Sequence, residues 1–405
     1  MTSALVAARS MGCPGCGAVL DLQGGTARAL ACPVCGWVVE RRTLRSLDGA
    51  LACASATLLL LIPANLSPLL TTMAMGATRT SYLASAAAVT WRQGEPLVGV
   101  LTTLFLGVFP LARFALLTLV LARVKLGRPA PWLGAAFRWA EVLEIWAMAD
   151  VFVLALIVTY ARLAATIPTQ FGPGAWCFVA AGLMTLLTRA ALDKRAIWER
   201  IAPSRELAAP AAACGACGLL AGPENLEHPC PRCGHEIHAR SPAALRRATA
   251  LTVAGLLLYL PANLYPMATL PIGLTPRHYT VLQGVKDLIQ AHLLGLGLLV
   301  FVASFLIPIV KLVGLSWCVL SVIRRSTRRL QAKTRVFHVV DQIGRWSMLD
   351  PFVIGAFVPV VQYNDLVSGR AEPAATAFSV VVVATMIGAR CFDPRLMWDA
   401  LEARA

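Results

Sequence analysis

Eight cysteines in two groups of four are the residues whose types and spacing most directly suggest chemistry. The first group reads C-x2-C, fifteen residues, C-x2-C, and the second group has twelve residues between its two pairs. This spacing is typical of a zinc ribbon, in which four thiolates hold one metal ion tetrahedrally. The predicted ligands are Cys13, Cys16, Cys32 and Cys35 in the first group and Cys214, Cys217, Cys230 and Cys233 in the second.

Zinc is the metal that this pattern favours, and iron in a rubredoxin-like site and redox-active dithiols are the alternatives. Four protein ligands leave no open position for water, so we expect two structural sites and no catalytic residue. His228, His235 and His238 flank the second group. They could replace a thiolate, although ordinary surface histidines are the preferred interpretation.

Polar residues inside apolar stretches form a second set of candidates. Each ionisable side chain near the centre of a bilayer costs at least ~2.5 kcal/mol, which makes it a functional candidate by default. Each half of the chain has one cation, one carboxylate and one threonine, on three different predicted helices. These are Arg113, Asp150 and Thr185 in the first half and Lys311, Asp350 and Thr385 in the second.

Each set could form one hydrogen-bonded network. Lysine can lose its proton when it is desolvated, whereas arginine effectively cannot. The second set is therefore the better candidate for a proton-responsive site, in which Asp350 and Lys311 exchange charge and Thr385 bridges them. The alternative is a structural charge pair that fixes helix register.

The segment Pro-Ala-Asn-Leu occurs twice, at Pro63 to Leu66 and at Pro261 to Leu264. Because proline lacks an N–H group, we expect the first helix of each half to be broken or kinked near its outer end. Asn65 and Asn263 can then satisfy backbone groups that the membrane would leave without partners. A shaped opening toward the far side and a passive kink are both consistent with this pattern.

The elements that carry these residues are membrane helices. The 405 residues are 58% hydrophobic and 14% charged, with a mean hydropathy of +0.68, which is too apolar for an average soluble protein. Apolar runs of about 20 residues can cross the hydrocarbon of a bilayer. The predicted spans are 48–70, 96–122, 142–162, 172–190, 249–272, 293–323, 346–364 and 373–391.

The distribution of the 36 Lys and Arg residues predicts the orientation. Most of them fall at the N-terminus, between spans 2 and 3, 4 and 5, and 6 and 7, and at the C-terminus. Because cytoplasmic loops retain positive charge, both termini and both cysteine groups are expected in the cytoplasm. Structural disulfides are disfavoured in that reducing compartment, which agrees with metal binding.

The second half of the chain repeats the first. "CPVCG" at 32 recurs as "CPRCG" at 230, "FPLAR" at 109 as "IPIVK" at 307, and "WAMADVF" at 146 as "WSMLDPF" at 346. Four spans per half keep both copies in the same orientation, so we expect a parallel repeat. The predicted domains are a ribbon at 1–46, a four-helix unit at 47–199, a linker at 200–213, a second ribbon at 214–247 and a second four-helix unit at 248–405.

This combination of tandem four-span units, CPxCG-type ribbons and P-A-N-L-x-P segments resembles the paraquat-inducible protein A family of bacterial inner-membrane proteins. The resemblance covers residues 11 to 400. "CGACG" at 214 departs from the pattern, because it lacks the proline after the first cysteine.

The resemblance implies a multi-pass protein of the bacterial inner membrane with tetraspanin-like, all-α units. It further implies a periplasmic MCE-domain partner and transport of phospholipid between the two membranes, for envelope maintenance. We expect no enzymatic activity and no nucleic-acid partner. The competing functions are a membrane redox protein that uses its CxxC pairs with a quinone, and a membrane stress receptor.

Overall fold

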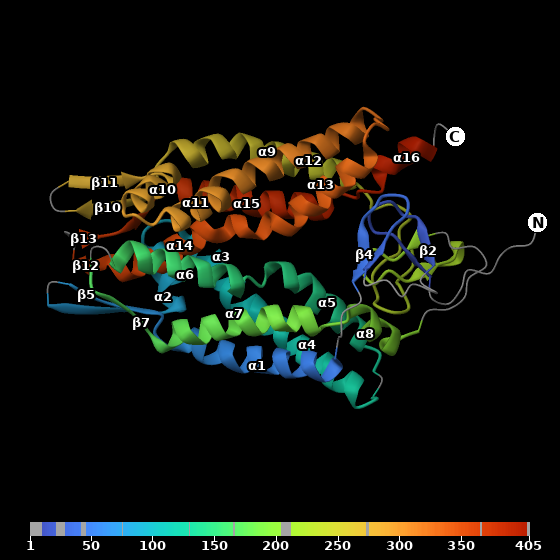
Figure 1. Cartoon of the computed structure of the whole chain (residues 1–405), viewed down its shortest axis with the longest axis horizontal. Helices are drawn as coiled ribbons and strands as arrows, with labels where there is room; N and C mark the ends of the chain where they lie inside the picture. Colours follow the sequence, from blue (N-terminus) through green and yellow to red (C-terminus); the bar gives the residue numbers. More distant parts are fainter. Residues whose placement is uncertain are drawn as a thin grey trace, which may run out of the picture.

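The computed structural model describes residues 10–21, 29–41, 46–74, 76–128, 130–164, 167–203, 212–272, 275–364 and 367–402. The expected linker at 200–213 lies mostly outside these residues. Two bundles of long helices lie side by side, and two small strand-containing domains sit together at one end of them (Figure 1). The final helix, α16, lies at that same end.

The first helical unit, residues 47–201, is mostly helical. Ser46 begins its first helix, because the Ser46 hydroxyl accepts a hydrogen bond from the Gly49 N–H. The elements in chain order are α1 (Leu47–Leu66), β5 (Leu70–Ala74), β6 (Ala77–Ser81), α2 (Leu83–Arg92), α3 (Pro96–Thr103), η1 (Leu104–Val108), α4 (Phe109–Lys125), α5 (Leu133–Trp146), α6 (Ala149–Ala164), β7 (Thr169–Phe171), α7 (Pro173–Ala191) and α8 (Lys194–Ile201).

The second helical unit, residues 244–402, begins with the same order of elements. Its additions are the 3-10 segments η4 and η5 on either side of α14 and the strands β12 and β13 that follow η5. The elements are α9 (Ala244–Leu264), β10 (Ala268–Ile272), β11 (Thr275–Tyr279), α10 (Val281–Gln290), α11 (Leu294–Phe301), η3 (Val302–Leu306), α12 (Ile307–Ile323), α13 (Leu330–Ile343), η4 (Gly344–Met348), α14 (Leu349–Phe357), η5 (Val358–Val361), β12 (Gln362–Asn364), β13 (Val367–Ser368), β14 (Arg370–Ala371), α15 (Pro373–Cys391) and α16 (Leu396–Glu402).

Six helices in the described part of the chain are long and apolar enough to cross a membrane. They are Leu47–Leu66, Pro96–Lys125, Leu133–Ala164, Pro173–Ala191, Leu294–Ile323 and Pro373–Cys391. Six of the eight predicted spans are therefore confirmed by length and composition. The other two correspond to α9, which has Arg246 and Arg247 in its first turn, and to α14, which is flanked by the 3-10 segments η4 and η5.

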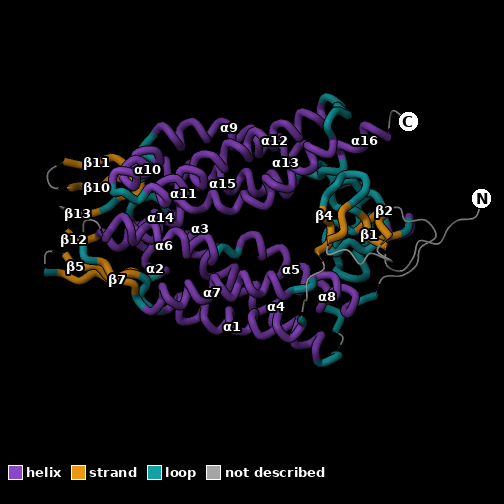
Figure 2. Tube along the Cα trace, viewed as in Figure 1, coloured by secondary structure: helices purple, strands orange, loops and turns teal. Residues whose placement is uncertain are grey.

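Short antiparallel sheets lie at the opposite end of the bundles from the cysteine domains (Figure 2). In the first unit the order is β6-β5-β7, with Leu70 opposite both Ser81 and Phe171. In the second unit the order is β11-β10-β14, with Ala268 opposite Tyr279 and Ala371. We call this the hairpin end and the opposite one the ribbon end.

The first helix of each unit continues through its proline. Pro63 lies inside α1 and Pro261 inside α9, and each helix ends three residues later. The sequence predicted that each helix is either broken or kinked at this proline. Because both helices continue for three residues beyond it, the structure excludes a break there. Helix termination follows at once because a second proline, Pro68 or Pro266, provides no N–H group for another helical turn.

The two helical units pack against each other through α6 and α14. Phe152 and Phe352 meet there edge to face, with ring centroids 6.2 Å apart. Nearer the hairpin end, the Gln93 amide donates to the Gly369 carbonyl and accepts from the Ala371 N–H. The buried core is therefore continuous from one unit to the other.

Candidate functional site

Each group of four cysteines forms one compact cluster. All four Sγ atoms of each group lie within 4.8 Å of one another. Cys13 and Cys35 are 3.6 Å apart and Cys214 and Cys233 are 3.7 Å apart, sulfur to sulfur. A tetrahedral metal with ~2.3 Å bonds to sulfur needs about 3.8 Å between its ligands, so the geometry fits a four-thiolate metal site.

Turn geometry explains why each cysteine pair is followed by glycine. The four glycines have a positive φ, which side chains with a Cβ rarely adopt, and the N–H of each bonds back to the first cysteine of its pair. They are Gly17, Gly36, Gly218 and Gly234. His228, His235 and His238 belong to neither cluster, and His238 lies 3.4 Å from Glu236 instead.

The ribbons are built from short hairpins. The first contains β1 (Ser10–Gly12), β2 (Val19–Asp21), β3 (Ala29–Ala31) and β4 (Val38–Arg41), and the second contains β8 (Ala212–Ala213), β9 (Leu220–Ala221) and η2 (Pro223–Asn225). Here the first ribbon means residues 10–41 and the second ribbon residues 212–238.

The first ribbon packs on the second helical unit. The Trp37 ring stacks on His338 of α13, with ring centroids 4.0 Å apart and 15° between the planes. The Gln331 amide donates to the Val34 carbonyl over 2.9 Å. Cys13, Cys32 and Cys35 share a buried cluster with residues of the second unit. The N-terminal ribbon therefore covers the C-terminal unit.

The second ribbon packs on the first helical unit. A Cβ at Gly134 of α5 would lie 1.8 Å from the Arg232 carbonyl oxygen, so only glycine permits this approach. Arg232 also lies 3.4 Å from Glu199 of α8. The two ribbons are thus exchanged between the units, and they touch each other where Gly12 meets Ala213.

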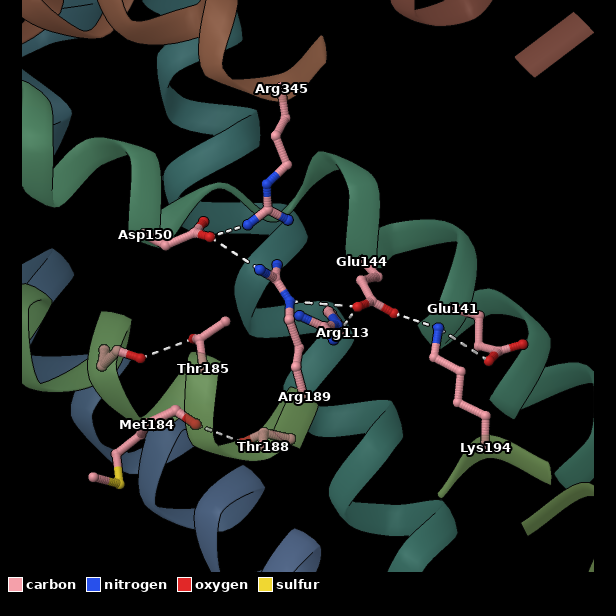
Figure 3. Close-up of polar contacts among 11 residues, drawn as sticks. Arg113, Glu141, Glu144, Asp150, Met184, Thr185, Thr188, Arg189, Lys194 and Arg345 are labelled. Atoms are coloured by element: carbon pink, nitrogen blue, oxygen red, sulfur yellow. Dashed lines mark hydrogen bonds and ion pairs between the residues drawn. The ribbon is translucent and has the colours of Figure 1, made fainter. Parts of the chain in front are cut away.

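A charge cluster lies at the ribbon end of the first helical unit, and Figure 3 shows its members pointing toward one another. Asp150 of α6 is its centre. Its Oδ2 atom lies 2.9 Å from Nη1 of Arg189 and also accepts a hydrogen bond from Arg345. Arg345 comes from η4 in the second helical unit, so this ion pair joins the two units.

Glu144 extends the cluster. One carboxylate oxygen of Glu144 lies 3.3 Å from Arg189 and 3.6 Å from the buried Arg113, and the other accepts a 2.7 Å hydrogen bond from Lys194. Lys194 also lies 3.4 Å from Glu141. The structure thus places Arg113 and Asp150 in one cluster, joined through Glu144 and Arg189 and without a direct contact.

Thr185 lies beside this cluster without joining it by a hydrogen bond. Its hydroxyl donates to the Ala181 carbonyl one turn earlier in α7, at 2.8 Å (Figure 3). Sequence reasoning missed Glu144, Arg189 and Arg345. Arg189 could have been found, because it lies one helical turn after Thr185 and faces the same way. Arg345 had no comparable signal, since its partner belongs to the other unit.

The corresponding residues of the second helical unit are arranged differently. Lys311 is 1% exposed and donates to the Gly344 carbonyl at 3.3 Å. Asp350 is 8% exposed, and its Oδ2 atom accepts no hydrogen bond from the described residues. The Thr385 hydroxyl donates to the Val381 carbonyl at 2.9 Å. No direct hydrogen bond or ion pair joins these three side chains within the described part of the chain.

Asn65 and Asn263 make the same kind of hydrogen bond. Each side-chain amide donates to the carbonyl four residues earlier, Asn65 to Leu61 at 2.7 Å and Asn263 to Tyr259 at 2.9 Å. Both asparagines therefore bond to their own helix beside the internal proline.

Comparison with known proteins agrees with this architecture. The family model described as "Paraquat-inducible protein A" matches residues 47–202 and 245–402. The "Intermembrane transport protein PqiA" of Escherichia coli (strain K12) is 28% identical over 363 residues, which covers 86% of this chain and 85% of that protein.

Two further relatives match less of the chain. The "Lipophilic envelope-spanning tunnel protein A" of Escherichia coli (strain K12) is 30% identical over 270 residues, 65% of this chain and 62% of that protein. A "Probable intermembrane transport protein" of Haemophilus influenzae is 25% identical over 298 residues, 71% of each chain. No solved structure matches significantly. The chain therefore belongs to the paraquat-inducible protein A family.

Proposed function

We propose that this protein is the inner-membrane subunit of a phospholipid transport system. It passes lipid between the inner membrane and an MCE-domain partner that spans the periplasm. The observation that carries the proposal is the match to the paraquat-inducible protein A family along both helical units, together with names of relatives that describe intermembrane transport. As part of this proposal, each helical unit crosses the membrane four times and the two units form a parallel repeat.

The proposed orientation places the ribbon end in the cytoplasm and the hairpin end in the periplasm. Lys and Arg are concentrated in the segments that join the helices at the ribbon end, which supports this direction. The periplasmic partner would then meet the two hairpin sheets. Each sheet has two edge strands with one neighbour each in the described sheets, β6 and β7 in the first and β11 and β14 in the second, and such edges can pair with another chain.

We further propose zinc as the resident metal of both ribbons. The Sγ atoms of the eight cysteines would hold it, and the metal would supply structural cross-linking of the hairpins. Sulfurs of different pairs lie close together, with Cys13 and Cys35 3.6 Å apart and Cys16 and Cys32 3.6 Å apart. Four sulfurs gathered around one point suit a metal ion, whereas a redox dithiol needs only one CxxC pair, so the arrangement favours metal binding over the redox alternative.

We place the proposed proton-responsive site in the second helical unit, at Lys311 and Asp350. Lys311 contacts a backbone carbonyl and Asp350 has an oxygen without a described hydrogen-bond donor, so each can change protonation without breaking an ion pair between described residues. Gain or loss of a proton there would bias the packing of α12, which carries Lys311, against η4, which leads directly into α14 and Asp350. We propose that the Thr385 side chain joins the network when this packing changes.

The test is transfer of a labelled phospholipid from proteoliposomes that contain the full chain to its purified MCE-domain partner. We expect lipid to appear in the partner only when both proteins are present, and Lys311→Met to reduce the transfer rate at least tenfold. Folding of the variant is checked by its elution profile and thermal unfolding. Normal transfer by a folded Lys311→Met protein would remove Lys311 from the mechanism.

Metal analysis separates transport from the redox alternative. We expect about one zinc per four ribbon cysteines, with thiols that become titratable as zinc is released. Reversible disulfides in a metal-free and fully folded protein, together with bound quinone, would favour the redox function instead.

A further inference from the structure

A shallow and open groove of about 650 Å³ lies at the ribbon end of the second helical unit. It is formed by the first turns of α9, the last residue of α12 and the start of α16. Small and apolar side chains line most of it, and Arg246 is its only charged lining residue in the described part of the chain. The lining residues are Ser241, Ala243, Ala244, Leu245, Arg246, Thr249, Ala250, Ile323 and Leu396.

The groove lies where a membrane helix ends. Ile323 is the last residue of the candidate span Leu294–Ile323, and Arg324 and Arg325 follow it directly. An apolar surface at this depth borders the acyl chains of the bilayer, while the arginines lie at the level of the lipid headgroups. A ligand that fills the groove must therefore have both an apolar and a polar part.

The charge at the groove is unbalanced. Arg246 is exposed, and it makes no ion pair with a carboxylate in the described ranges. Arg247, Arg324 and Arg325 are exposed nearby. Acidic lipid headgroups are attracted to such clusters of arginines next to a membrane helix.

At the equivalent position of the first helical unit, the side-chain charges cancel. At the separation of 198 residues that relates the two Pro-Ala-Asn-Leu segments, Arg246 corresponds to Asp48 and Ile323 to Lys125. Lys125 and Asp48 form an ion pair of 2.7 Å. The second unit thus has an arginine beside an isoleucine where the first has a closed charge pair.

We propose that this groove binds an anionic phospholipid from the leaflet at the ribbon end. Arg246 holds the phosphate of the headgroup, and one acyl chain lies along the apolar wall between α9 and Ile323. The proposal rests on the membrane placement given under the proposed function, and it specifies the leaflet and the headgroup charge of a lipid that the protein holds.

The test measures lipid binding to the purified full chain without any partner, so it is independent of transport. Native mass spectrometry follows retention of phosphatidylglycerol, with phosphatidylcholine of the same acyl chains as the neutral probe. We expect phosphatidylglycerol to be retained preferentially. Arg246→Gln should weaken its retention about fivefold, since one arginine near an anionic headgroup contributes roughly this factor.

Two further variants make the test specific. Arg247→Gln is the matched control, because Arg247 is the adjacent exposed arginine and does not line the groove. It should weaken retention clearly less than Arg246→Gln, because Arg247 contributes to the general attraction of the arginine cluster but does not line the groove. The double substitution Arg246→Asp with Ile323→Lys copies the ion pair of the first unit, and it should abolish the preference for phosphatidylglycerol while the protein stays folded.

Three results would overturn the proposal. These are equal retention of the two lipids by the wild type, equal losses in Arg246→Gln and Arg247→Gln, and displacement of phosphatidylglycerol by millimolar inorganic phosphate. The last result would mean a simple anion site without a role for the acyl chain. Failure of lipid transfer to the MCE-domain partner would leave the binding result intact and would instead contradict the proposed function.

Discussion

The two helical units carry the same motifs, but their buried charged side chains have different partners. In the first unit, Asp150 contacts two arginines, and Glu144 joins Arg113 and Lys194 to the same cluster. At the corresponding positions of the second unit, Lys311 has a carbonyl partner and Asp350 lacks a donor for one oxygen.

The difference comes from neighbours and not from the motif residues themselves. Glu144 corresponds to Gly344 at a separation of 200, and Arg189 corresponds to Ala389. Replacing these two side chains removes the ion-pair partners while the cation and the carboxylate stay. A motif shared by two repeats therefore does not imply the same contacts: the first unit has a network of ion pairs around Asp150, whereas Lys311 and Asp350 form no direct ion pair with the residues that the structure describes.

Asp150→Asn is the substitution with the largest expected effect on this comparison. It leaves Arg189 and Arg345 without their carboxylate, and removing one partner of a buried ion pair costs about 3 to 5 kcal/mol. Asp350→Asn, the matched variant, should cost less than about 1 kcal/mol in stability and should instead impair lipid transfer. Thermal unfolding in a fixed detergent measures the first effect, and equal destabilisation by both variants would contradict the distinction.

Arg345 tests whether the two units are energetically coupled. We expect Arg345→Gln to destabilise the protein by roughly 1 to 3 kcal/mol, less than Asp150→Asn, because Arg189 still holds the carboxylate. A double-mutant cycle of the two substitutions should give a coupling of about 0.5 to 3 kcal/mol. Additive effects would show that the contact between the units contributes nothing.

Gly344→Ala tests the contact between Lys311 and η4 in the second unit. A Cβ at this position would lie 3.2 Å from Nζ of Lys311, which must then shift. Because the contact is with the flexible end of a side chain, the cost in stability should be about 1 kcal/mol or less, whereas lipid transfer should fall severalfold. Glu144→Ala, the matched change, should reduce stability more than transfer. The reverse pattern would exchange the roles assigned to the units.

Asp393 gives the smallest expected effect, which depends on pH. Burial opposes ionisation of this side chain, but hydrogen bonds from Arg395 and the Ser241 N–H outweigh it and lower its pKa. The ionised form therefore stabilises the fold above the unfolded pKa of about 3.9, and this contribution is lost as pH falls through the lower folded pKa. Asp393→Asn should flatten the decline in melting temperature below pH 4 by a few degrees. An unchanged decline would exclude Asp393 as its source.

The local features were predictable from the sequence because they depend on neighbouring residues. Cysteine spacing predicted both clusters, and apolar run length predicted six helices that are long and apolar enough to cross a membrane. The repeat identified Lys311 as the counterpart of Arg113. Membrane helices need about 20 apolar residues whatever surrounds them, which makes such runs easy to recognise.

The long-range features were not predictable in this way. Arg345 reaches Asp150 from 195 positions along the chain, and no periodicity within one unit reports such a contact. Proline indicated the end of the first helix but not its position, because Ser67 still donates to the Pro63 carbonyl and completes the last turn. The exchange of the ribbons depends on surface complementarity between Trp37 and His338, which spacing alone does not encode.

That exchange has a consequence for how the protein is made. The first ribbon is synthesised early, whereas its docking surface at His338 follows about 300 residues later. At the usual ~5 to 20 residues per second, this ribbon waits roughly 15 to 60 s on the ribosome before its surface exists. A small domain that acquires its metal during that interval is folded before it is needed. Metal supply during translation would then control the yield of the mature membrane protein.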